Sequence, residues 1–237
     1  MGSFEFQFKQ FGINHSNSTM KIGTDAIVLG ALIENNDANS ILEIGTGCGI
    51  ISLMLAQRFQ AKITAVEIDL KSGKQAQENI DASPWKDRIE VIQGDIRMIN
   101  LNKKFDLIVC NPPYFQNDLQ SNSSSKKLAR HSNTLTFDEL HQTSSTHLKE
   151  DGYLWVILPP LGFHQFSNSA NNHSFYCTNQ IDIFASIQHS CTLIVSKWGK
   201  RKGTKINSSL YLRNIDGTYS DEYQEATKAF HPVSYFL

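Results

Sequence analysis

From about residue 40 onward, short apolar runs alternate with longer amphipathic segments. Runs rich in β-branched residues predict strands, and apolar residues at helical spacing predict helices. The predicted strands cover 40–45, 62–68, 88–93, 104–110 and 153–159, and the predicted helices cover 51–59, 71–82 and 163–171. Strands that alternate with helices form a parallel, doubly wound sheet with right-handed crossovers. The pattern therefore predicts an α/β, Rossmann-like fold with helices on both faces of the sheet.

The C-terminal part of the chain has a different pattern. Residues 191–200 and 206–214 form two further strand-like runs joined by a short link that contains glycine. Such a pair is typical of an antiparallel hairpin. With the five strands above, the sequence predicts a mostly parallel, seven-stranded sheet that ends in a C-terminal antiparallel hairpin.

The first 39 residues precede the predicted core. They contain the turn-like segment IGTD followed by an apolar helical stretch, which Thr24 or Asp25 could cap. We expect a single domain over residues 1–237, in which 1–39 form an N-terminal cap and 40–237 form the core. The polar, basic segment 121–131 predicts a mobile loop.

Composition excludes several classes of protein. The formal net charge of −1 gives no global indication of nucleic-acid binding, so that function must rest on local clusters. The four cysteines have neither paired nor metal-ligand spacing, which predicts reduced thiols in a cytoplasmic protein. No apolar run approaches the roughly 18 residues of a membrane helix, and the eight histidines show no metal-ligand pattern. We therefore expect no membrane partner and no metal.

The end of each of the first three strands carries glycine or acidic residues. Residues 43–49 read EIGTGCG, in which closely spaced glycines allow a tight turn and the close approach of a ligand to the backbone. The spacing is G-x-G-x-G and differs from the G-x-G-x-x-G of dinucleotide sites. Glu67 ends the second strand, where an acid can bind the two hydroxyls of a ribose. Asp95 follows the third strand and offers a carboxylate to an adenine amino group.

Residues 40–115 together resemble the class I S-adenosylmethionine-dependent methyltransferases, with their motifs in order and at family spacing. The alternative for the glycine turn alone is an ordinary strand-to-helix connection. The resemblance implies S-adenosyl-L-methionine as the cofactor. It also implies that the cofactor is bound by Glu43, Gly45, Gly47, Gly49, Glu67, Ile68, Asp95, Ile96 and Asn111.

The fourth strand ends in Asn111-Pro112-Pro113-Tyr114. Proline fixes its own backbone and forces the preceding residue into an extended conformation, so this segment is stiff. The side-chain oxygen of Asn111 and the main-chain oxygen of Pro112 can then both accept hydrogen bonds from one planar amine, while Tyr114 stacks on its ring. The alternative is a rigid turn without catalytic function. Because a complete set of cofactor motifs precedes this segment in the sequence, we expect Asn111, Pro112 and Tyr114 to be catalytic.

NPPY occurs in enzymes that methylate adenine N6 in DNA, amino groups in RNA, and glutamine amides in proteins. The N-terminal segment decides between them, because it resembles that of the bacterial tRNA1(Val) adenine-N6-methyltransferases. The likeness is carried by Gln10, Phe11, His15, Met20, Lys21, Gly23, Thr24 and Asp25, by 129–131 and by 219–230. The segment HSNSTM and the tail 231–237 depart from that family's pattern. The resemblance implies that Lys21, Gly23 and Thr24 fold over the methionine half of the cofactor.

Two basic clusters follow the predicted strand ends. Affinity for RNA depends on cations that contact phosphates. The first cluster contains Lys126, Lys127 and Arg130, and the second contains Lys197, Lys200, Arg201, Lys202 and Lys205. Each alone is typical of a solvated loop. We expect both to lie at the carboxyl edge of the sheet and to bind RNA.

These observations predict a cytoplasmic enzyme that methylates adenine N6 in tRNA, with adenine 37 beside the anticodon as the expected target. Protein-glutamine N5-methylation and ribosomal RNA guanine-N2-methylation are the alternative reactions. A non-catalytic RNA-binding scaffold is the alternative outside enzymes. The sequence leaves the oligomeric state open and slightly favours a monomer.

Overall fold

The computed structural model describes residues 4–18, 21–34, 37–113, 135–232 and 235–236. The helices are α1 (Thr24–Leu32), α2 (Ile50–Arg58), α3 (Leu70–Asp81), α5 (Phe137–His147), α6 (Pro160–Asn172) and α7 (Asp221–Thr227), with a 3-10 turn η1 at Lys86–Arg88. The strands are β1 (Phe6–Gln7), β2 (Gly12–Ile13), β3 (Ser40–Ile44), β4 (Lys62–Glu67), β5 (Ile89–Gln93), β6 (Phe105–Cys110), β7 (Leu148–Leu158), β8 (Tyr176–Phe184), β9 (Cys191–Gly199) and β10 (Ile206–Tyr211).

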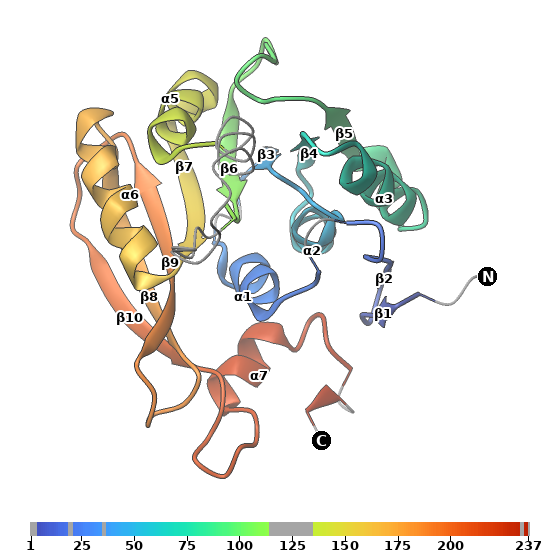
Figure 1. Ribbon diagram of the computed structural model, residues 1–237, viewed down its shortest axis with the longest axis vertical. Coiled ribbons are helices and arrows are strands. Elements are labelled where there is room, and N and C mark those ends of the chain that lie inside the picture. Colours follow the sequence, from blue (N-terminus) through green and yellow to red (C-terminus); the bar gives the residue numbers. More distant parts are fainter. Residues whose placement is uncertain (1–3, 19–20, 35–36, 114–134, 233–234, 237) are drawn as a thin grey trace, which may run out of the picture.

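A central sheet organises the molecule (Figure 1), and its strand order in the described residues is β10-β8-β9-β7-β6-β3-β4-β5. Strands β5, β4, β3, β6 and β7 are parallel to one another. Helices α1, α2 and α3 cover one face and α5 and α6 cover the other. The Rossmann-like fold expected from the sequence is confirmed, as are its helices on both faces.

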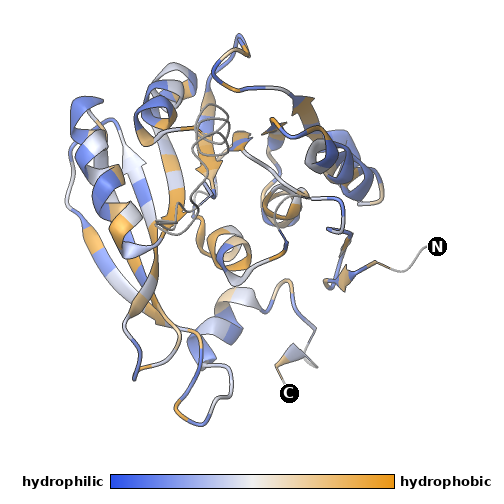
Figure 2. Cartoon of the chain, viewed as in Figure 1, coloured by the Kyte–Doolittle hydropathy of each residue, from blue (hydrophilic) through white to orange (hydrophobic). Residues whose placement is uncertain are grey.

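Both faces of the strands are apolar because both are covered. Ile41, Leu107 and Val109 pack in the core cluster beneath α1 and α2, whereas Leu42 and Ile108 pack beneath α5 and α6. Figure 2 shows that apolar residues run along these strands, whereas the surrounding helices carry many polar residues. Strands that are buried on both faces give nearly continuous apolar runs, and these runs made the parallel strands recognisable in the sequence.

The sheet has a C-terminal antiparallel hairpin, as predicted, but the number of strands and the strands that form the hairpin differ from the prediction. The sheet has eight strands, because Tyr176–Phe184 forms β8. The antiparallel pair is β8 with β9, and β10 pairs parallel to β8 on its far side, so β9 and β10 do not form the expected hairpin. Residues 178–180 of β8 are polar, and most of the strand is only half-buried, since it lies toward the edge of the sheet. A short link between two strands therefore did not mean that they pair.

Helix α1 begins differently from the prediction. Its N-cap residue is Gly23, which has no side chain to cap the helix, and Thr24 and Asp25 lie inside the first turn. The helix is buried along most of its length and packs closely on α2, where a Cβ at Gly30 would lie 2.8 Å from the Met54 sulfur. The Arg58 guanidinium donates hydrogen bonds to the carbonyl oxygens of Gly30 and Ala31, both at 2.8 Å. The C-terminal end of α1 is thus fixed against α2.

The two ends of the described chain lie together. The Lys9 amide donates to the Phe230 carbonyl at 2.8 Å, and the Phe8 ring stacks on His231 with centroids 5.4 Å apart. His231 in turn stacks on Tyr235, with centroids 3.7 Å apart. The short hairpin of β1 and β2 is therefore held by the segment that follows α7. Among the described helices, none is both long and apolar enough to cross a membrane.

Candidate active site

The candidate site lies at the carboxyl ends of β3, β4, β5 and β6. These ends are level, since Ile44 pairs with both Val66 and Cys110, and Glu67 pairs with Gln93. After β3 the chain adds β4 and then β5 on one side of β3, and it then returns to place β6 on the other side. Open α/β sheets bind ligands at such a switch in strand order. The glycine turn after β3 and Asn111 after β6 lie on either side of this point.

The glycine turn leaves its backbone open to a ligand. Gly45, Gly47 and Gly49 have positive φ angles of 76°, 59° and 85°, a conformation that other residues rarely adopt. A Cβ at Gly45 would meet no atom within 4 Å, so the space beside it is empty of protein among the described residues. Gly49 is the N-cap of α2, whose first backbone N–H groups thus point toward the same turn. The turn suits a ligand that lies flat on the main chain.

Glu67 joins the glycine turn to the end of β4. One carboxylate oxygen accepts the Gly47 amide and the other accepts the Asp69 amide, each at 2.8 Å. The side chain is only 7% exposed. Each carboxylate oxygen has a further lone pair, so Glu67 can still accept hydrogen bonds from ribose hydroxyls. The structure places Glu67 at the end of β4, and its contact with a ribose stays a prediction.

Glu43 supports the turn from beneath. Its carboxyl group is buried and accepts hydrogen bonds from the hydroxyl of Thr46, at 2.7 Å, and from that of Ser52. Burial raises the pKa of Glu43 to about 7, against the lowering effect of these hydroxyl groups. Glu43 therefore acts on the shape of the glycine turn, and direct contact with a cofactor stays a prediction.

The raised pKa predicts a loss of stability with increasing pH. The folded state favours the protonated Glu43 carboxyl, so its contribution is present below the ordinary pKa of 4.5 and is lost as pH rises through about 7. We expect Glu43→Gln to flatten the fall in melting temperature between pH 5 and pH 8 by several degrees. Glu90→Gln, an exposed change on β5, is the control. Parallel curves for Glu43→Gln and the unmodified protein in differential scanning fluorimetry would contradict this assignment.

Asp95 is held by an ion-pair network that the sequence did not suggest. The Arg97 guanidinium donates to both Asp95 carboxylate oxygens at 2.6–2.9 Å and to Glu139 of α5 at 3.0 Å. The hydrogen bonds from Arg97 lower the pKa of Asp95. Asp95 is thus fixed as a carboxylate, which retains acceptor capacity for an adenine amino group.

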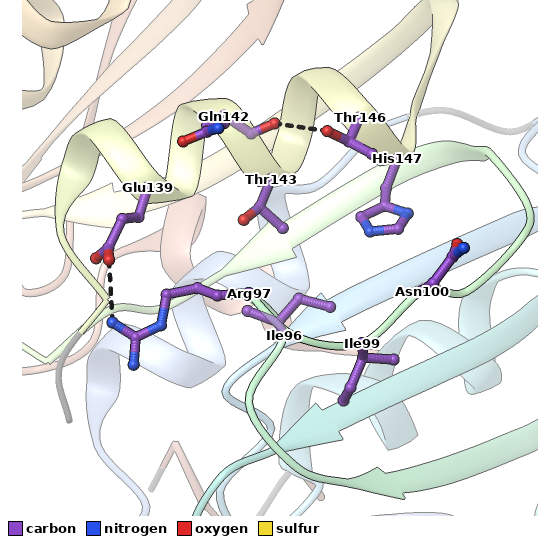
Figure 3. Close-up of a pocket in the computed structure, with 9 residues that line it drawn as sticks. All are labelled: Ile96, Arg97, Ile99, Asn100, Glu139, Gln142, Thr143, Thr146 and His147. Carbon is purple, nitrogen blue, oxygen red and sulfur yellow. Dashed lines mark hydrogen bonds and ion pairs between the residues drawn. The ribbon is translucent and has the colours of Figure 1, made fainter.

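A cavity of about 390 Å³ lies between this network and α5 (Figure 3). Arg97 and Glu139 face each other at one end, and Ile96 and His147 also line the cavity. Ile96 is buried, whereas Ile68, which follows Glu67, is 46% exposed. An exposed isoleucine beside two strand ends provides an apolar surface for a flat ring. The contacts of Ile68 and Ile96 with an adenine stay predictions.

Asn111 has a partner that the sequence did not indicate. Its side-chain NH₂ group donates to the Asp25 carboxylate at 2.9 Å, across 86 residues of chain. Both side chains are half-buried, and Pro112 is buried. Burial raises the pKa of the Cys110 thiol, which makes this neighbour unreactive at neutral pH. Tyr114, the third predicted catalytic residue, lies outside the described residues.

The N-terminal segment borders the glycine turn. The Asn79 side chain of α3 donates to the carbonyl oxygens of Asn14 and Cys48, both at 2.8 Å, and so joins this segment to the turn. Lys21 donates from Nζ to the carbonyl oxygens of His15 and Ser16, at 3.0 and 3.2 Å. Lys21 is thus held by the N-terminal segment itself, and the expected cap of Lys21, Gly23 and Thr24 over the cofactor stays a prediction.

The predicted position of the second basic cluster is wrong. Because β9 is antiparallel to β7, Gly199 pairs with Tyr153 and the link that follows lies at the amino edge of the parallel strands, opposite the candidate site. Lys200 donates to the carbonyl oxygens of Ser145 and Leu148, where α5 passes into β7. Arg201 forms an ion pair with Asp151 at 2.7 Å.

Other members of the cluster have partners on the sheet. The Lys197 ammonium lies 3.8 Å from the centre of the Tyr153 ring, and burial lowers its pKa. Lys205 donates to the Gln180 side chain at 2.6 Å, and Lys202 is exposed. The argument that this cluster flanks the active site therefore fails, and RNA binding by these five residues stays a prediction. Lys126, Lys127 and Arg130 lie outside the described residues.

Comparison with known proteins gives the family. Residues 8–165 match the family model of the methyltransferase small domain. A tRNA1(Val) (adenine(37)-N6)-methyltransferase of Bacteroides thetaiotaomicron is 36% identical over 95% of this chain and 96% of its own length. The enzyme of the same name from Phocaeicola vulgatus is 38% identical over 95% of this chain and 97% of its own. This chain belongs to the family of the tRNA1(Val) (adenine(37)-N6)-methyltransferases.

A solved structure supports the fold. A predicted O-methyltransferase from Agrobacterium tumefaciens superposes with a TM-score of 0.70 over 87% of this chain and 96% of that one, at 17% sequence identity. The resemblance drawn from the NPPY and glycine motifs is thus confirmed at the level of family and fold.

The residues present fit S-adenosyl-L-methionine. The open space beside Gly45, the Glu67 carboxylate and the fixed Asp95 carboxylate offer a backbone surface, a partner for ribose and a partner for adenine along one edge. Within the described ranges, no group of three or more His, Cys, Asp or Glu residues is arranged to hold a metal ion.

Proposed function

We propose that this protein transfers a methyl group from S-adenosyl-L-methionine to N6 of adenine 37 in tRNA1(Val). The observation that carries the proposal is the Asn111 amide, which is oriented by Asp25 at the end of β6, across the switch point from the open glycine turn. A cofactor on the turn and a planar amine at Asn111 would then meet at the same edge of the sheet.

The Asn111 side chain and the Pro112 backbone would bind the target amine. The lone pair of an exocyclic adenine amine is delocalised into the ring, which makes the nitrogen a weak nucleophile. Two acceptors on its two N–H groups hold the amine in place and localise that lone pair. When bound, S-adenosylmethionine supplies an electrophilic methyl group on a sulfonium. The amine nitrogen would gain the methyl group as the bond between that carbon and the sulfonium sulfur breaks, which leaves S-adenosylhomocysteine. The nitrogen would then release one proton to water, so no strong base is required of Asn111.

The names of the relatives support tRNA as the substrate. Both carry adenine 37 of tRNA1(Val) in their names, and the match extends over nearly the full length of each. A tRNA substrate places the protein in the cytoplasm, which we propose as its location. The target base must leave its stack to reach a recessed amide, as bases in loops do at low cost.

The test is methylation of defined tRNAs. We expect incubation with tritiated cofactor and a tRNA1(Val) transcript to give labelled N6-methyladenosine in nucleoside digests. The same transcript with guanine at position 37 should give none. Methylation of the guanine transcript, or N2-methylguanosine among the products, would exclude the proposed target atom.

Protein glutamine is the alternative substrate that the NPPY motif leaves open. A protein extract incubated in parallel with the labelled cofactor distinguishes the two, because N5-methylglutamine survives proteolysis and ribonuclease treatment. Label confined to RNA supports the proposal, and label in glutamine overturns it.

The basic residues of the link after β9 are tested by salt dependence. If Arg201 and Lys202 contact phosphates, replacing both with glutamine will lower the slope of log affinity against log salt by about two. An unchanged slope would show that the amino edge of the sheet does not take part in RNA binding.

A further inference from the structure

We propose that Asp25 is a positioning residue that fixes which end of the Asn111 amide faces the substrate. The proposal rests on the proposed function and names a determinant of that same site. Its starting point is the contact between the Asn111 NH₂ group and the Asp25 carboxylate at 2.9 Å.

An asparagine side chain can present two opposite chemistries. A rotation of the amide by half a turn exchanges its carbonyl oxygen, an acceptor, with its NH₂ group, a donor. Only the carbonyl oxygen can accept an N–H of the target amine. If the NH₂ group faced the substrate, two donors would oppose each other and the amine would not bind.

A carboxylate removes this ambiguity, because it accepts hydrogen bonds and has none to donate. With Asp25 on one side of Asn111, the amide gains a charge-assisted hydrogen bond only when its NH₂ group points to Asp25. The carbonyl oxygen is then directed away from Asp25. The contact thus selects the orientation in which Asn111 can accept from an amine.

The local structure fixes Asp25 itself. It lies in the first turn of α1, a helix that is buried against α2 and held at its other end by Arg58. The second carboxylate oxygen of Asp25 lies over Gly23, where a Cβ would be only 2.2 Å away. Gly23 has a φ of −116°, which any residue can adopt, so glycine is needed here for space. Helix α1 therefore offers a rigid support for the amide.

The contact between Asp25 and Asn111 also connects two features that were separate in the sequence, the start of α1 and the NPPY segment. The sequence left Thr24 or Asp25 as the possible cap of this helix, but the N-cap is Gly23 and the Asp25 side chain is directed to Asn111. The segment that contains Asp25 precedes the cofactor turn, and the NPPY segment follows β6. Their contact joins the N-terminal cap to the substrate-binding end of the site.

The test exchanges the two side chains. In Asn111→Asp, two carboxylates would lie at the distance of a hydrogen bond, which raises the pKa of one of them and disturbs the pair. In the double variant Asp25→Asn with Asn111→Asp, the new amide at 25 donates to the new carboxylate at 111. The other oxygen of that carboxylate still accepts from the target amine.

We expect the following values of kcat on the tRNA1(Val) transcript. Asp25→Asn lowers kcat about tenfold and Asn111→Asp lowers it about 100-fold, since a misplaced reacting group costs up to this much. The double variant should regain about tenfold over Asn111→Asp, with the KM for the cofactor nearly constant. Asp221→Asn, the same change in the first turn of α7, controls for the general effect of an acidic residue at a helix start and should leave kcat unchanged.

Thermal unfolding provides a readout that needs no substrate. Asn111→Asp should lower the melting temperature by about 2–4 °C, and the double variant should regain that loss. If the unmodified protein does not methylate the transcript but the melting temperatures still show this coupling, the proposed function fails and the contact stands. If the unmodified protein is active but the exchange rescues neither kcat nor melting temperature, the role of Asp25 is overturned.

Discussion

Replacing Asn111 with alanine should lower kcat for adenine methylation by about 10²- to 10³-fold, the cost of removing one preorganised hydrogen-bonding group at a reacting atom. The alanine variant keeps the Pro112 carbonyl but loses the side-chain acceptor, so the amine is held by one bond and can rotate out of line. The partner Asp25 is left without the Asn111 amide. Single-turnover methylation of the tRNA1(Val) transcript measures the chemical step directly.

Cofactor affinity separates a catalytic effect from a folding defect. The glycine turn and Glu67 belong to β3 and β4, so the dissociation constant for S-adenosylhomocysteine should stay within about threefold, or 0.65 kcal/mol, of the unmodified value. Asn207→Ala, an exposed asparagine on β10, is the matched control and should be fully active. Turnover by Asn111→Ala within about fivefold of normal would refute the proposed role of the amide.

Glu67→Gln should weaken cofactor binding by about 100-fold, or ~2.7 kcal/mol, because hydrogen bonds to a charged group contribute about 1.5–3 kcal/mol each. The new NH₂ group must also face a backbone N–H, since Gly47 and Asp69 donate to the two carboxylate oxygens. Both the ribose contact and the shape of the glycine turn are lost together. Isothermal titration with S-adenosylhomocysteine measures the effect.

Glu90→Gln, on the neighbouring strand β5, is the matched control for this change. Its side chain is exposed and pairs only loosely with Lys103, at 4.0 Å, so affinity should not change. A Glu67→Gln variant that binds S-adenosylhomocysteine as well as this control would show that neither a ribose contact of Glu67 nor its hydrogen bonds to the turn contribute to cofactor affinity. The kcat of Glu67→Gln at saturating cofactor should remain near normal, which distinguishes it from Asn111→Ala.

The parallel strands were predictable because their signal is local. Strands β3, β4 and β6 are short apolar runs that are buried along most of their length. In the segment from Ser40 to Arg58, such a run is followed by glycines and a helix. Strand β8 lacked this signal, since a half-buried strand with Thr178, Asn179 and Gln180 in its middle does not differ from a polar loop. The basic link lies at the amino edge because β9 runs antiparallel to β7, whereas the sequence predicted a β9 parallel to the sheet. The wrong pairing predicted for β9 therefore led to the wrong edge of the sheet for the basic link.

The candidate site also contains groups that the sequence predicts and partners that it does not predict. Three features directly follow or end predicted parallel strands: the glycine turn, Glu67 and NPPY. Their spacing along the chain therefore predicts that they meet at one edge of the sheet. The partners of these groups come from packing, which no spacing reveals. Arg97 reaches Glu139 on α5, and Asp25 reaches Asn111 only because α1 packs on α2. The sequence shows only that Asp25 is an acidic residue at the start of a helix. The helix dipole favours such a residue there in any case, so the sequence did not indicate a contact with Asn111.

The contact between the two ends of the chain has a consequence during synthesis. The hairpin of β1 and β2 leaves the ribosome before the sheet does, yet it is held by Phe230 and His231. Lys9 also donates a hydrogen bond to the carbonyl oxygen of Lys228, which is 219 residues later. Contacts of such high sequence separation form late in folding. The sheet and its glycine turn can assemble while translation continues, but the N-terminal segment that borders the turn must wait. A nascent chain would therefore gain its full affinity for the cofactor only after α7 has been made.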